Sequence, residues 1–461
     1  RGPARPHAPP RFPISGYSGS MLLPLLLACS GPDAPVDSGE ALPPPGVLVI
    51  IADDLGVDAS ACYPEFPGVQ RAPQPAIEAL CARGVVFDRV WANPVCSPSR
   101  AGLLTGRYSH RHGVGEAVGD GSAGLSLDER LLPAALDAAG SGVAHAAFGK
   151  WHLSASDNGG DEHPTLAGFS HFSGAMGGEV LDYERWEQVV DGQAEAATGY
   201  VTTRTVNDAA HWIEQQRGPW LATVSFHAPH TPIHVPPVAL HSQEGCVEEG
   251  INEDPVPCFL AMVESMDREL GRLVEGLHPD TIIVYLGDNG SLDSVDQGAW
   301  PEGHAKSTLY LGASWVPLVI VAPGLASPGR RDDLVDIVDL FPTLLELAGA
   351  DLGAALDPER PIDGQSLLPV LADPAQAHPR RFQLAEWFGP RAAALVSGQA
   401  ITDGRLKRIR FRSGEEQLFD IEADPAESVA LDPEALSSPD RAIWDSLGAE
   451  LDARPVPVTG G

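Results

Sequence analysis

The chain has 461 residues, of which 43% are apolar, and a formal net charge of −33. That length and apolar content allow a large buried core, in one large domain or in one large and one small domain. The acidity argues against nucleic acid and anionic membrane surfaces as partners, because both would be repelled. A small anionic substrate is compatible with the charge if a local cluster of cations binds it.

The N-terminal part is predicted to carry an export signal. An apolar run from Met21 to Ala28 is too short to span a bilayer, and "LLACS" resembles the cleavage pattern of bacterial lipoprotein signals. The resemblance implies cleavage before Cys29 and a lipid anchor on that cysteine, with an ordinary cleaved signal peptide as the alternative. Both predict an exported protein, either secreted or held in the periplasm or at the cell surface. Residues 1–28 would be the signal and upstream segment, and 29–45 a Pro-rich tether.

The cysteines indicate one thiol with a special role. The sequence has six, so five remain when Cys29 is set aside for a lipid. An odd number in an oxidising compartment suggests that one cysteine serves another purpose. Closeness in sequence pairs Cys62 with Cys81 and Cys246 with Cys258 and leaves Cys96, although some of these could instead be buried thiols.

Apolar runs typical of buried strands alternate with helical patterns along most of the chain. The predicted strands lie at residues 46–52, 143–149, 220–226, 281–287 and 316–322, and the predicted helices at 75–84, 130–140, 201–216, 260–277 and 334–349. Alternation of this kind predicts an α/β fold in which helices sandwich a mainly parallel sheet.

Charged or imidazole side chains follow four of these strands. The four groups are Asp53-Asp54, Lys150 with His152, His227 with His230, and Asp288-Asn289. Ligands of open α/β sheets bind at the carboxyl ends of the strands, so the four groups are expected to meet at one edge.

The chemistry of these groups is coherent. Carboxylate and amide oxygens suit Ca²⁺, with Mg²⁺ also possible, and a divalent cation would offset the repulsion between clustered carboxylates. Lysine, histidine and arginine side chains nearby would bind an anion. The sequence therefore predicts a site that holds a tetrahedral oxyanion ester between a metal and cations.

The segment "CSPSRAGLLTG", residues 96–106, resembles the signature of the type I, formylglycine-dependent sulfatases of the alkaline-phosphatase-like superfamily. In that family a maturation enzyme oxidises the signature cysteine to Cα-formylglycine. The resemblance covers about residues 46 to 430, because "IADDLG", "GKWHL", "HAPHTP", "LGDNG" and "LFDIEADPAES" follow in the family's order. It implies the alkaline-phosphatase-like fold and makes Cys96 the precursor of the nucleophile.

The resemblance also implies a role for each candidate site residue. The metal ligands would be Asp53, Asp54, Asp288, Asn289 and the modified Cys96, while Arg100 and Lys150 would hold the aldehyde hydrate, Lys306 and His230 the sulfate, and His152 would lie beside the nucleophile. A hydrated aldehyde offers two hydroxyls, one to attack sulfur and one to expel sulfate. Asp288 is a candidate base that deprotonates the attacking hydroxyl. His230 or Lys306 is a candidate acid that protonates the departing alcohol. His152 is a candidate to accept the proton whose removal releases sulfate.

The implied activity is hydrolysis of sulfate monoesters, with a sulfated carbohydrate as the expected substrate. Two alternatives stay open: a phosphonate monoester or phosphodiester hydrolase of the same superfamily, and a non-catalytic glycan-binding lipoprotein with unmodified Cys96. The chain also departs from the family at Leu311 and Trp315, where glutamate and arginine are usual. Either a structural ion pair was lost, or a substrate subsite has changed.

The pattern changes after residue 374. Short strands separated by turns predict a small antiparallel sheet with a helix, so we expect a catalytic domain at 46–374 and a C-terminal α+β subdomain at 375–461. The chain has three lysines, Lys150, Lys306 and Lys407. Two of them are candidate site residues, and Lys407 is expected on an exposed strand.

Overall fold

The computed structural model describes residues 46–63, 66, 68–119 and 121–456. The predicted signal, the tether and Cys29 lie outside these residues. Within them, no helix is both long enough and apolar enough to cross a membrane.

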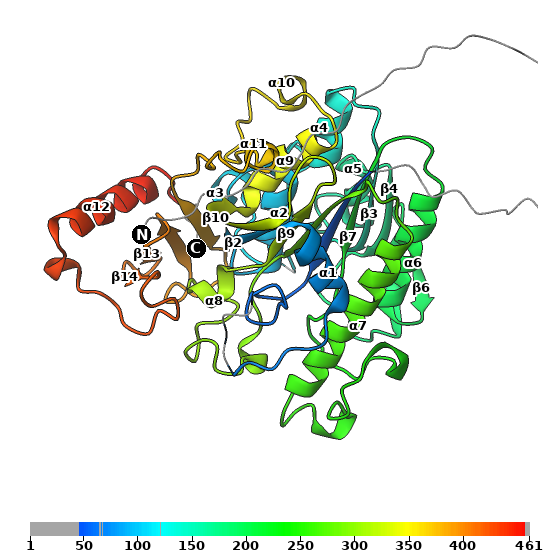
Figure 1. The fold of residues 1–461 in the computed structure, drawn as a ribbon, viewed down its shortest axis with the longest axis horizontal. Coiled ribbons are helices and arrows are strands. Elements are labelled where there is room, and N and C mark those ends of the chain that lie inside the picture. The colour runs from blue at the N-terminus through cyan, green and yellow to red at the C-terminus, as the bar shows by residue number, and fades with distance from the viewer. Residues whose placement is uncertain (1–45, 64–65, 67, 120, 457–461) are drawn as a thin grey trace, which may run out of the picture. The chain divides into compact units, whose positions relative to one another are not determined.

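A ten-stranded sheet forms the centre of the fold (Figure 1), in the order β10-β2-β9-β8-β1-β7-β3-β4-β5-β6. The strands are β1 Val47–Ala52, β2 Val85–Trp91, β3 Ala144–Lys150, β4 His171–Ala175, β5 Arg185–Val190, β6 Gln193–Thr198, β7 Trp220–Ser225, β8 Ile282–Gly287, β9 Leu318–Val321 and β10 Gly329–Asp336. The central strands β8, β1, β7, β3 and β4 pair in parallel, which confirms the predicted fold class. The predicted strand at 316–322 is also present, but β9 runs antiparallel to both of its neighbours.

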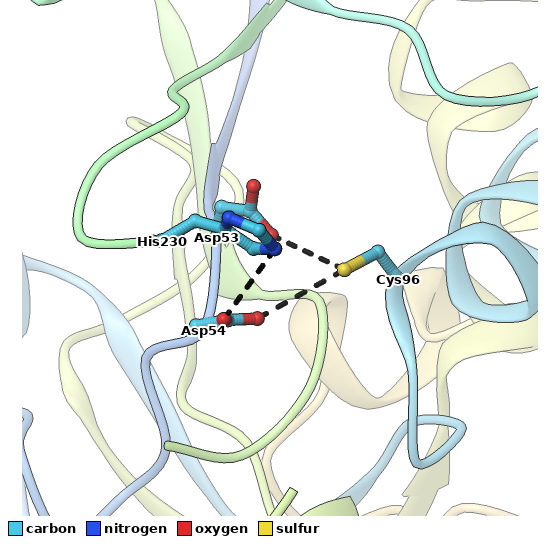
Figure 2. A group of neighbouring side chains, drawn as sticks. All are labelled: Asp53, Asp54, Cys96 and His230. Carbon is cyan, nitrogen blue, oxygen red and sulfur yellow. Dashed lines mark hydrogen bonds and ion pairs between the residues drawn. The ribbon is translucent and has the colours of Figure 1, made fainter. Parts of the chain in front are cut away.

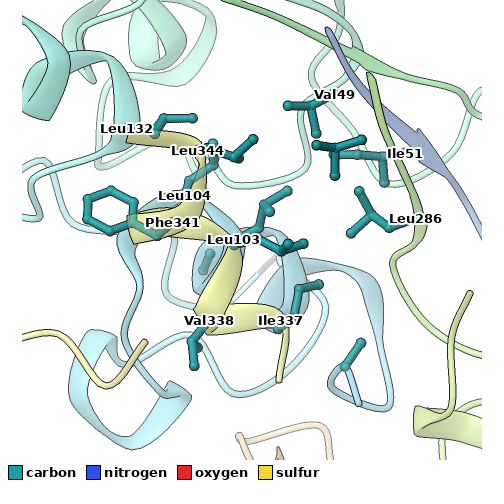
Figure 3. Close-up of a cluster of buried hydrophobic side chains, with 14 of the residues drawn as sticks. Val49, Ile51, Leu103, Leu104, Leu132, Leu286, Ile337, Val338, Phe341 and Leu344 are labelled. Atoms are coloured by element: carbon teal, nitrogen blue, oxygen red, sulfur yellow. The ribbon is translucent and has the colours of Figure 1, made fainter. Parts of the chain in front are cut away.

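Helices cover both faces of the sheet, because alternate residues of the buried strands point to opposite sides. On one side, Leu48 and Ile50 of β1 belong to the same core as α1 (Pro75–Arg83), α6 (Val201–Glu214) and α7 (Val256–Glu275). On the other side, Val49 and Ile51 share a core with α2 (Cys96–Thr105), α4 (Leu132–Ala138) and α9 (Leu340–Leu347). Figure 3 shows this second core, where Leu103 and Leu104 of α2 lie among Val338, Phe341 and Leu344.

The helix predicted at 334–349 is wrong in its first half. Val335 and Asp336 belong to β10, and a short 3₁₀ turn, η5 (Ile337–Asp339), separates this strand from α9. Asp336 and Asp339 form a capping box across the turn. Pairing of β10 with β2 therefore overrides the helical pattern of the segment.

The C-terminal part forms the predicted antiparallel sheet with a helix. Its strands are β11 Gln383–Trp387, β12 Gly398–Thr402, β13 Leu406–Phe411 and β14 Glu416–Asp420, with α12 Ser438–Asp452 packed on β12 and β13. The expectation that Lys407 is exposed is wrong. Its side chain is 0% exposed on β13 and forms an ion pair with Glu427. The domain boundary at residue 375 stays a prediction.

Two disulfides join Cys62 to Cys81 and Cys246 to Cys258, which confirms the predicted pairing. Among the residues that the structure describes, Cys96 is the one free cysteine, and it is buried. The small remaining elements are α3 Ser109–His112, α5 His163–Leu166, α8 Leu311–Ser314, α10 Leu352–Ala355, α11 Leu368–Ala372 and the 3₁₀ turns η1 Gly160–Glu162, η2 Val238–Leu240, η3 Glu248–Gly250, η4 Asp293–Val295 and η6 Pro433–Ala435.

Candidate active site

Four neighbouring parallel strands deliver polar side chains to one edge of the sheet. β8, β1, β7 and β3 are adjacent, and their carboxyl ends carry Asp288-Asn289, Asp53-Asp54, His227 with His230, and Lys150 with His152. Two further groups come from outside these strands: Cys96 and Arg100 from α2, and Lys306 from the segment between η4 and α8. The ten candidate site residues, together with His227, thus lie in one connected cluster.

Cys96 occupies the centre of this cluster and is the first residue of α2 (Figure 2). Its thiol lies 3.3 Å from Asp53 Oδ1 and 3.9 Å from Asp54 Oδ1, and it accepts contacts from the ammonium groups of Lys150 and Lys306, each at 3.5 Å. The helix starts here because Val95 is extended, and it ends at Gly106, whose φ of 69° suits glycine. A helix N-terminus favours negative charge on residue 96.

Two lysines bind the adjacent carboxylates. The Lys150 ammonium contacts Asp53, and the Lys306 ammonium contacts Asp54. His230 approaches Asp54 from the loop after β7, with Nε2 3.7 Å from Oδ2. The side chains of Lys306 and His230 keep 9% and 13% exposure, whereas Lys150 is fully enclosed. Lys306 and His230 are therefore the two cations that an incoming anion can meet first.

Arg100 lies on the same helix as Cys96 and links it to β8 and β3. Its Nε donates to Asp288 Oδ2 at 2.9 Å, and its Nη1 donates to the backbone oxygen of Lys150 at 3.0 Å. Asn289 completes this side of the site, since its Nδ2 donates to Asp54 Oδ1 at 2.8 Å. The arrangement fixes α2 against the ends of the two strands.

The backbone is strained at three positions of the site. Asp54, His152 and Ser307, which follows Lys306, have φ values of 63°, 60° and 67°. Non-glycine residues rarely occupy this left-handed region, and each costs about 1–3 kcal/mol unless the surroundings enforce it. Such strain concentrates at functional sites, where it aims side chains that an ordinary backbone would not.

The cations shift the ionisation of the groups around them. Burial raises the pKa of the Cys96 thiol, but Lys150 and Lys306 outweigh this and bring its pKa to about 7. Burial likewise acts to raise the pKa of Asp54, yet Lys306 and His230 hold it well below its usual range. The pKa of Asp53 is raised by burial and by the neighbouring Cys96. Residue 96 therefore sits where negative charge is stabilised.

The histidines and Asp288 have contrasting protonation. Burial and Lys150 act to lower the pKa of His230, but Asp54 and Asp53 raise it to about 9, so this imidazole carries a proton at neutral pH. Burial, Lys150 and Arg100 hold the pKa of His152 well below its usual value, so that ring is neutral. Burial and Asp53 raise the pKa of Asp288 to about 6. The site thus pairs a proton donor with proton acceptors.

The donor groups fit a divalent cation bound by oxygen. Ligand atoms of Asp53, Asp54, Cys96 and His230 lie within 4.8 Å of one another. Asp54 Oδ2 and Asn289 Oδ1 are buried without a hydrogen-bond partner, so both can accept a further contact. His230 approaches this group from the loop after β7 and keeps 13% exposure, so it also faces the side from which an anion enters. The carboxylate and amide oxygens are the ligands that Ca²⁺ and Mg²⁺ prefer.

Sequence patterns did not reveal two residues that hold the site together. Ser97 Oγ donates to the backbone oxygen of His152 at 2.8 Å and accepts from the amide of Val118 at 2.9 Å. The Tyr183 hydroxyl lies 2.9 Å and 2.8 Å from the backbone oxygens of His227 and His230. Ser97 is next to Cys96 and could have been suspected, whereas Tyr183 lies in a loop with no motif.

His227, which follows the same strand as His230, is almost fully enclosed. It is 2% exposed, and neither ring nitrogen has a hydrogen-bond partner among the described residues. At the two departures from the family pattern, Leu311 is buried in the core and Trp315 is partly buried against it, where Trp315 Nε1 donates to the backbone oxygen of Asp88 at 2.8 Å. No ion pair joins these two positions.

Comparisons with known proteins agree with these features. The chain matches the family model named Sulfatase over residues 45–350, and the model described as N-sulphoglucosamine sulphohydrolase, C-terminal, over residues 303–442. It is 27% identical to the uncharacterized sulfatase YdeN of Escherichia coli, over 73% of this chain and 68% of that protein. It is 27% identical to the N-acetylgalactosamine-6-sulfatase of Canis lupus familiaris, over 78% and 71% of the two chains.

Solved structures share the fold. The crystal structure of Ps i-CgsB in complex with k-i-k-neocarrahexaose superposes with a TM-score of 0.72 and 24% identity, over 89% of this chain and 92% of that one. The structure of BT4656 in complex with its substrate, D-glucosamine-2-N,6-O-disulfate, gives a TM-score of 0.69 and 21% identity, over 89% and 98%.

Proposed function

The chain belongs to the sulfatase family and is a sulfuric ester hydrolase, and from that premise we propose that it hydrolyses sulfate monoesters of carbohydrates with a formylglycine made from Cys96. The observation that carries the proposal is the position of Cys96. It lies between two carboxylates and two lysines at the start of a buried helix that carries the family signature. The carbohydrate is supported by relatives that act on sulfated sugars.

Each residue around Cys96 has a separate role in the proposed reaction. A hydrated formylglycine supplies one hydroxyl that attacks sulfur and a second whose deprotonation releases sulfate. Lys306 and protonated His230, the two partly exposed cations, bind the sulfate oxygens, while Lys150 and Arg100 position residue 96. Asp288 accepts the proton of the attacking hydroxyl, and neutral His152 accepts the proton that accompanies sulfate release.

The departing alcohol needs a proton. His230 can donate one at neutral pH because its pKa is about 9. Burial acts to lower the pKa of Lys306, but Asp54 and Cys96 raise it above its usual value, so Lys306 is the weaker acid of the two. We therefore favour His230 as the proton donor and Lys306 as the holder of the sulfate. This choice separates two roles that the sequence alone left shared.

The oxygen-rich half of the site would hold Ca²⁺, or Mg²⁺ in its place. Asp53, Asp54, Asp288 and Asn289 would be the protein ligands, together with the modified residue 96. A bound cation would supply positive charge that polarises the sulfate ester. It would also offset the repulsion among three carboxylates that burial brings together.

Adding Ca²⁺ to chelator-treated protein is expected to raise its thermal stability, because a cation that binds only the folded state stabilises it. At a hundred times the dissociation constant the gain is about 2.7 kcal/mol. Differential scanning fluorimetry measures the shift, and Asp54→Asn should reduce it strongly. Equal shifts in wild-type protein and in Asp54→Asn would contradict a metal at these ligands.

Turnover of an aryl sulfate, and of the phosphonate monoester and phosphodiester of the same phenol, tests the proposed reaction. We expect the highest kcat/KM for the sulfate ester, because relatives with named substrates act on sulfated sugars. A higher kcat/KM for the phosphonate monoester or the phosphodiester would point instead to that branch of the superfamily. Turnover of none of the three esters in formylglycine-containing protein would favour a glycan-binding role.

We also propose export of the mature chain, with lipidation at Cys29 as its anchor and a formylglycine-generating enzyme as its maturation partner. Two disulfides support an oxidising compartment. Labelled palmitate should enter the wild-type protein and be absent from Cys29→Ala, and label in both would contradict the anchor.

A further inference from the structure

The segment that presents Lys306 is held by the C-terminal sheet. Lys306 lies between His304 and Tyr310, whose rings stack with centroids 3.6 Å apart and an angle of 8°. The Tyr310 hydroxyl donates to Gln417 Oε1 at 2.9 Å, and the His304 ring lies 3.3 Å from the backbone oxygen of Ala426. Both sides of the loop that carries Lys306 are therefore attached to residues near or on β14.

A buried ion pair lies at the end of this attachment. Lys407 Nζ is 2.6 Å from Glu427 Oε1, and the two side chains are 0% and 1% exposed. The other carboxylate oxygen of Glu427 accepts the backbone amide of Leu311, the first residue of α8. Glu427 adopts a left-handed φ of 56°, which aims its side chain inward at a cost in backbone energy.

Aromatic rings enclose the Lys407 ammonium. It lies 5.2 Å from the ring centroid of Trp91 and 5.9 Å from that of Tyr310. Its charge is thus balanced by one carboxylate and two π faces, in a place where an unpaired charge would be costly. One face of Tyr310 contacts Lys407 of the ion pair, and the ring also stacks on His304. The ion pair is therefore connected through Tyr310 to both sides of the loop that carries Lys306.

The middle of the loop is bound to the segment that precedes Cys96 and to the segment after β8. The amide of Ser307 donates to the backbone oxygen of Pro94 at 3.1 Å, and the amide of Lys306 donates to that of Ser291 at 3.0 Å. The distance between Lys306 and Cys96 is set by these bonds on one side and by the C-terminal sheet on the other. A shift of the loop would move the ammonium relative to the sulfate.

We propose that the Lys407–Glu427 ion pair is a positioning pair that fixes Lys306 for catalysis. The inference rests on the proposed role of Lys306 in binding sulfate. It assigns the C-terminal sheet a part in the active site, although none of its residues contacts Cys96 or the candidate metal ligands among the contacts described above. Loss of one partner should lower the stability of the protein but leave it folded, while Lys306 loses its fixed position.

A double-mutant cycle on kcat/KM for an activated aryl sulfate tests the proposal. Glu427→Gln in the wild-type background is expected to lower kcat/KM roughly tenfold, since misplacing a group by about 1 Å can cost a hundredfold. In a Lys306→Ala background the same substitution should change kcat/KM by less than about twofold. Its effect should disappear there because both substitutions impair the same function, the binding of sulfate by Lys306. Lys407→Met should behave like Glu427→Gln in both backgrounds.

Arg408→Met is the matched control, because Arg408 neighbours Lys407 on β13 and pairs with Glu416 away from the Lys306 loop. It should lower the melting temperature and leave kcat/KM unchanged.

Equal activity losses in Arg408→Met and Glu427→Gln, or a full loss from Glu427→Gln in the Lys306→Ala background, would overturn the proposal. If Glu427→Gln does not fold, Glu427→Asp, which keeps the charge but shortens the side chain, enters the same cycle. Wild-type protein without sulfatase activity would instead contradict the proposed function.

Discussion

Cys96→Ala is expected to abolish sulfate ester hydrolysis, lowering kcat on the order of 10⁴-fold or more, as loss of a catalytic nucleophile does in other hydrolases. Alanine cannot be converted to an aldehyde, so the variant has no hydroxyl to attack sulfur. The fold should persist, because the thiol is small and its neighbours pair among themselves through Lys150–Asp53 and Lys306–Asp54.

Initial rates with an aryl sulfate measure the loss, and circular dichroism with a melting curve checks the fold. Exposed Leu181→Ala, 83% exposed, is a control that should keep full activity. If folded Cys96→Ala retained more than about a hundredth of wild-type kcat, catalysis would depend on metal and cations alone. The assignment of Cys96 as nucleophile precursor would then be wrong.

Lys306→Arg and Lys150→Arg are each expected to lower kcat/KM about a hundredfold or more. Both ammonium groups lie 3.5 Å from the Cys96 sulfur and contact a buried carboxylate, so the space available to them is small. The wider planar guanidinium keeps the charge but displaces the reacting atoms. Both substitutions keep the positive charge. A loss of this size would therefore show that the exact position of the ammonium matters, and not only its charge.

Arg204→Lys serves as the reverse control, because Arg204 is 43% exposed and its substitution should leave turnover unchanged. Melting temperatures identify any variant whose loss of activity reflects unfolding. Near-normal kcat/KM in a folded Lys306→Arg or Lys150→Arg would remove that lysine from the site. The two lysines can therefore be judged separately.

The site was accessible to sequence reasoning because its residues follow buried strands. β1, β3, β7 and β8 are nearly continuous apolar runs, and each ends next to a charged or imidazole group. Parallel neighbours bring those ends together, so the edge could be predicted without knowledge of the strand order. The signature at Cys96 then supplied the nucleophile, which no strand pattern would have identified.

Other parts depended on tertiary contacts. β10 and β6 are the two edges of the large sheet and carry many polar residues, as exposed edges do, so neither resembles a buried strand. Lys407 was expected at the surface because lysine is seldom enclosed, and its partner Glu427 lies in a turn after β14. The long-range hydrogen bond from Tyr183 to the loop of His230 likewise could not be predicted, because no local sequence pattern indicates it.

The chemical state of residue 96 tests the central claim most directly. Trypsin should release the peptide from Val90 to Arg100, which contains Cys96 between two arginine cleavage sites. In active protein co-produced with a maturation enzyme, we expect this peptide to have the mass of an aldehyde in place of the thiol and to react with a hydrazide probe. An intact thiol in all copies of a fully active preparation would contradict the account.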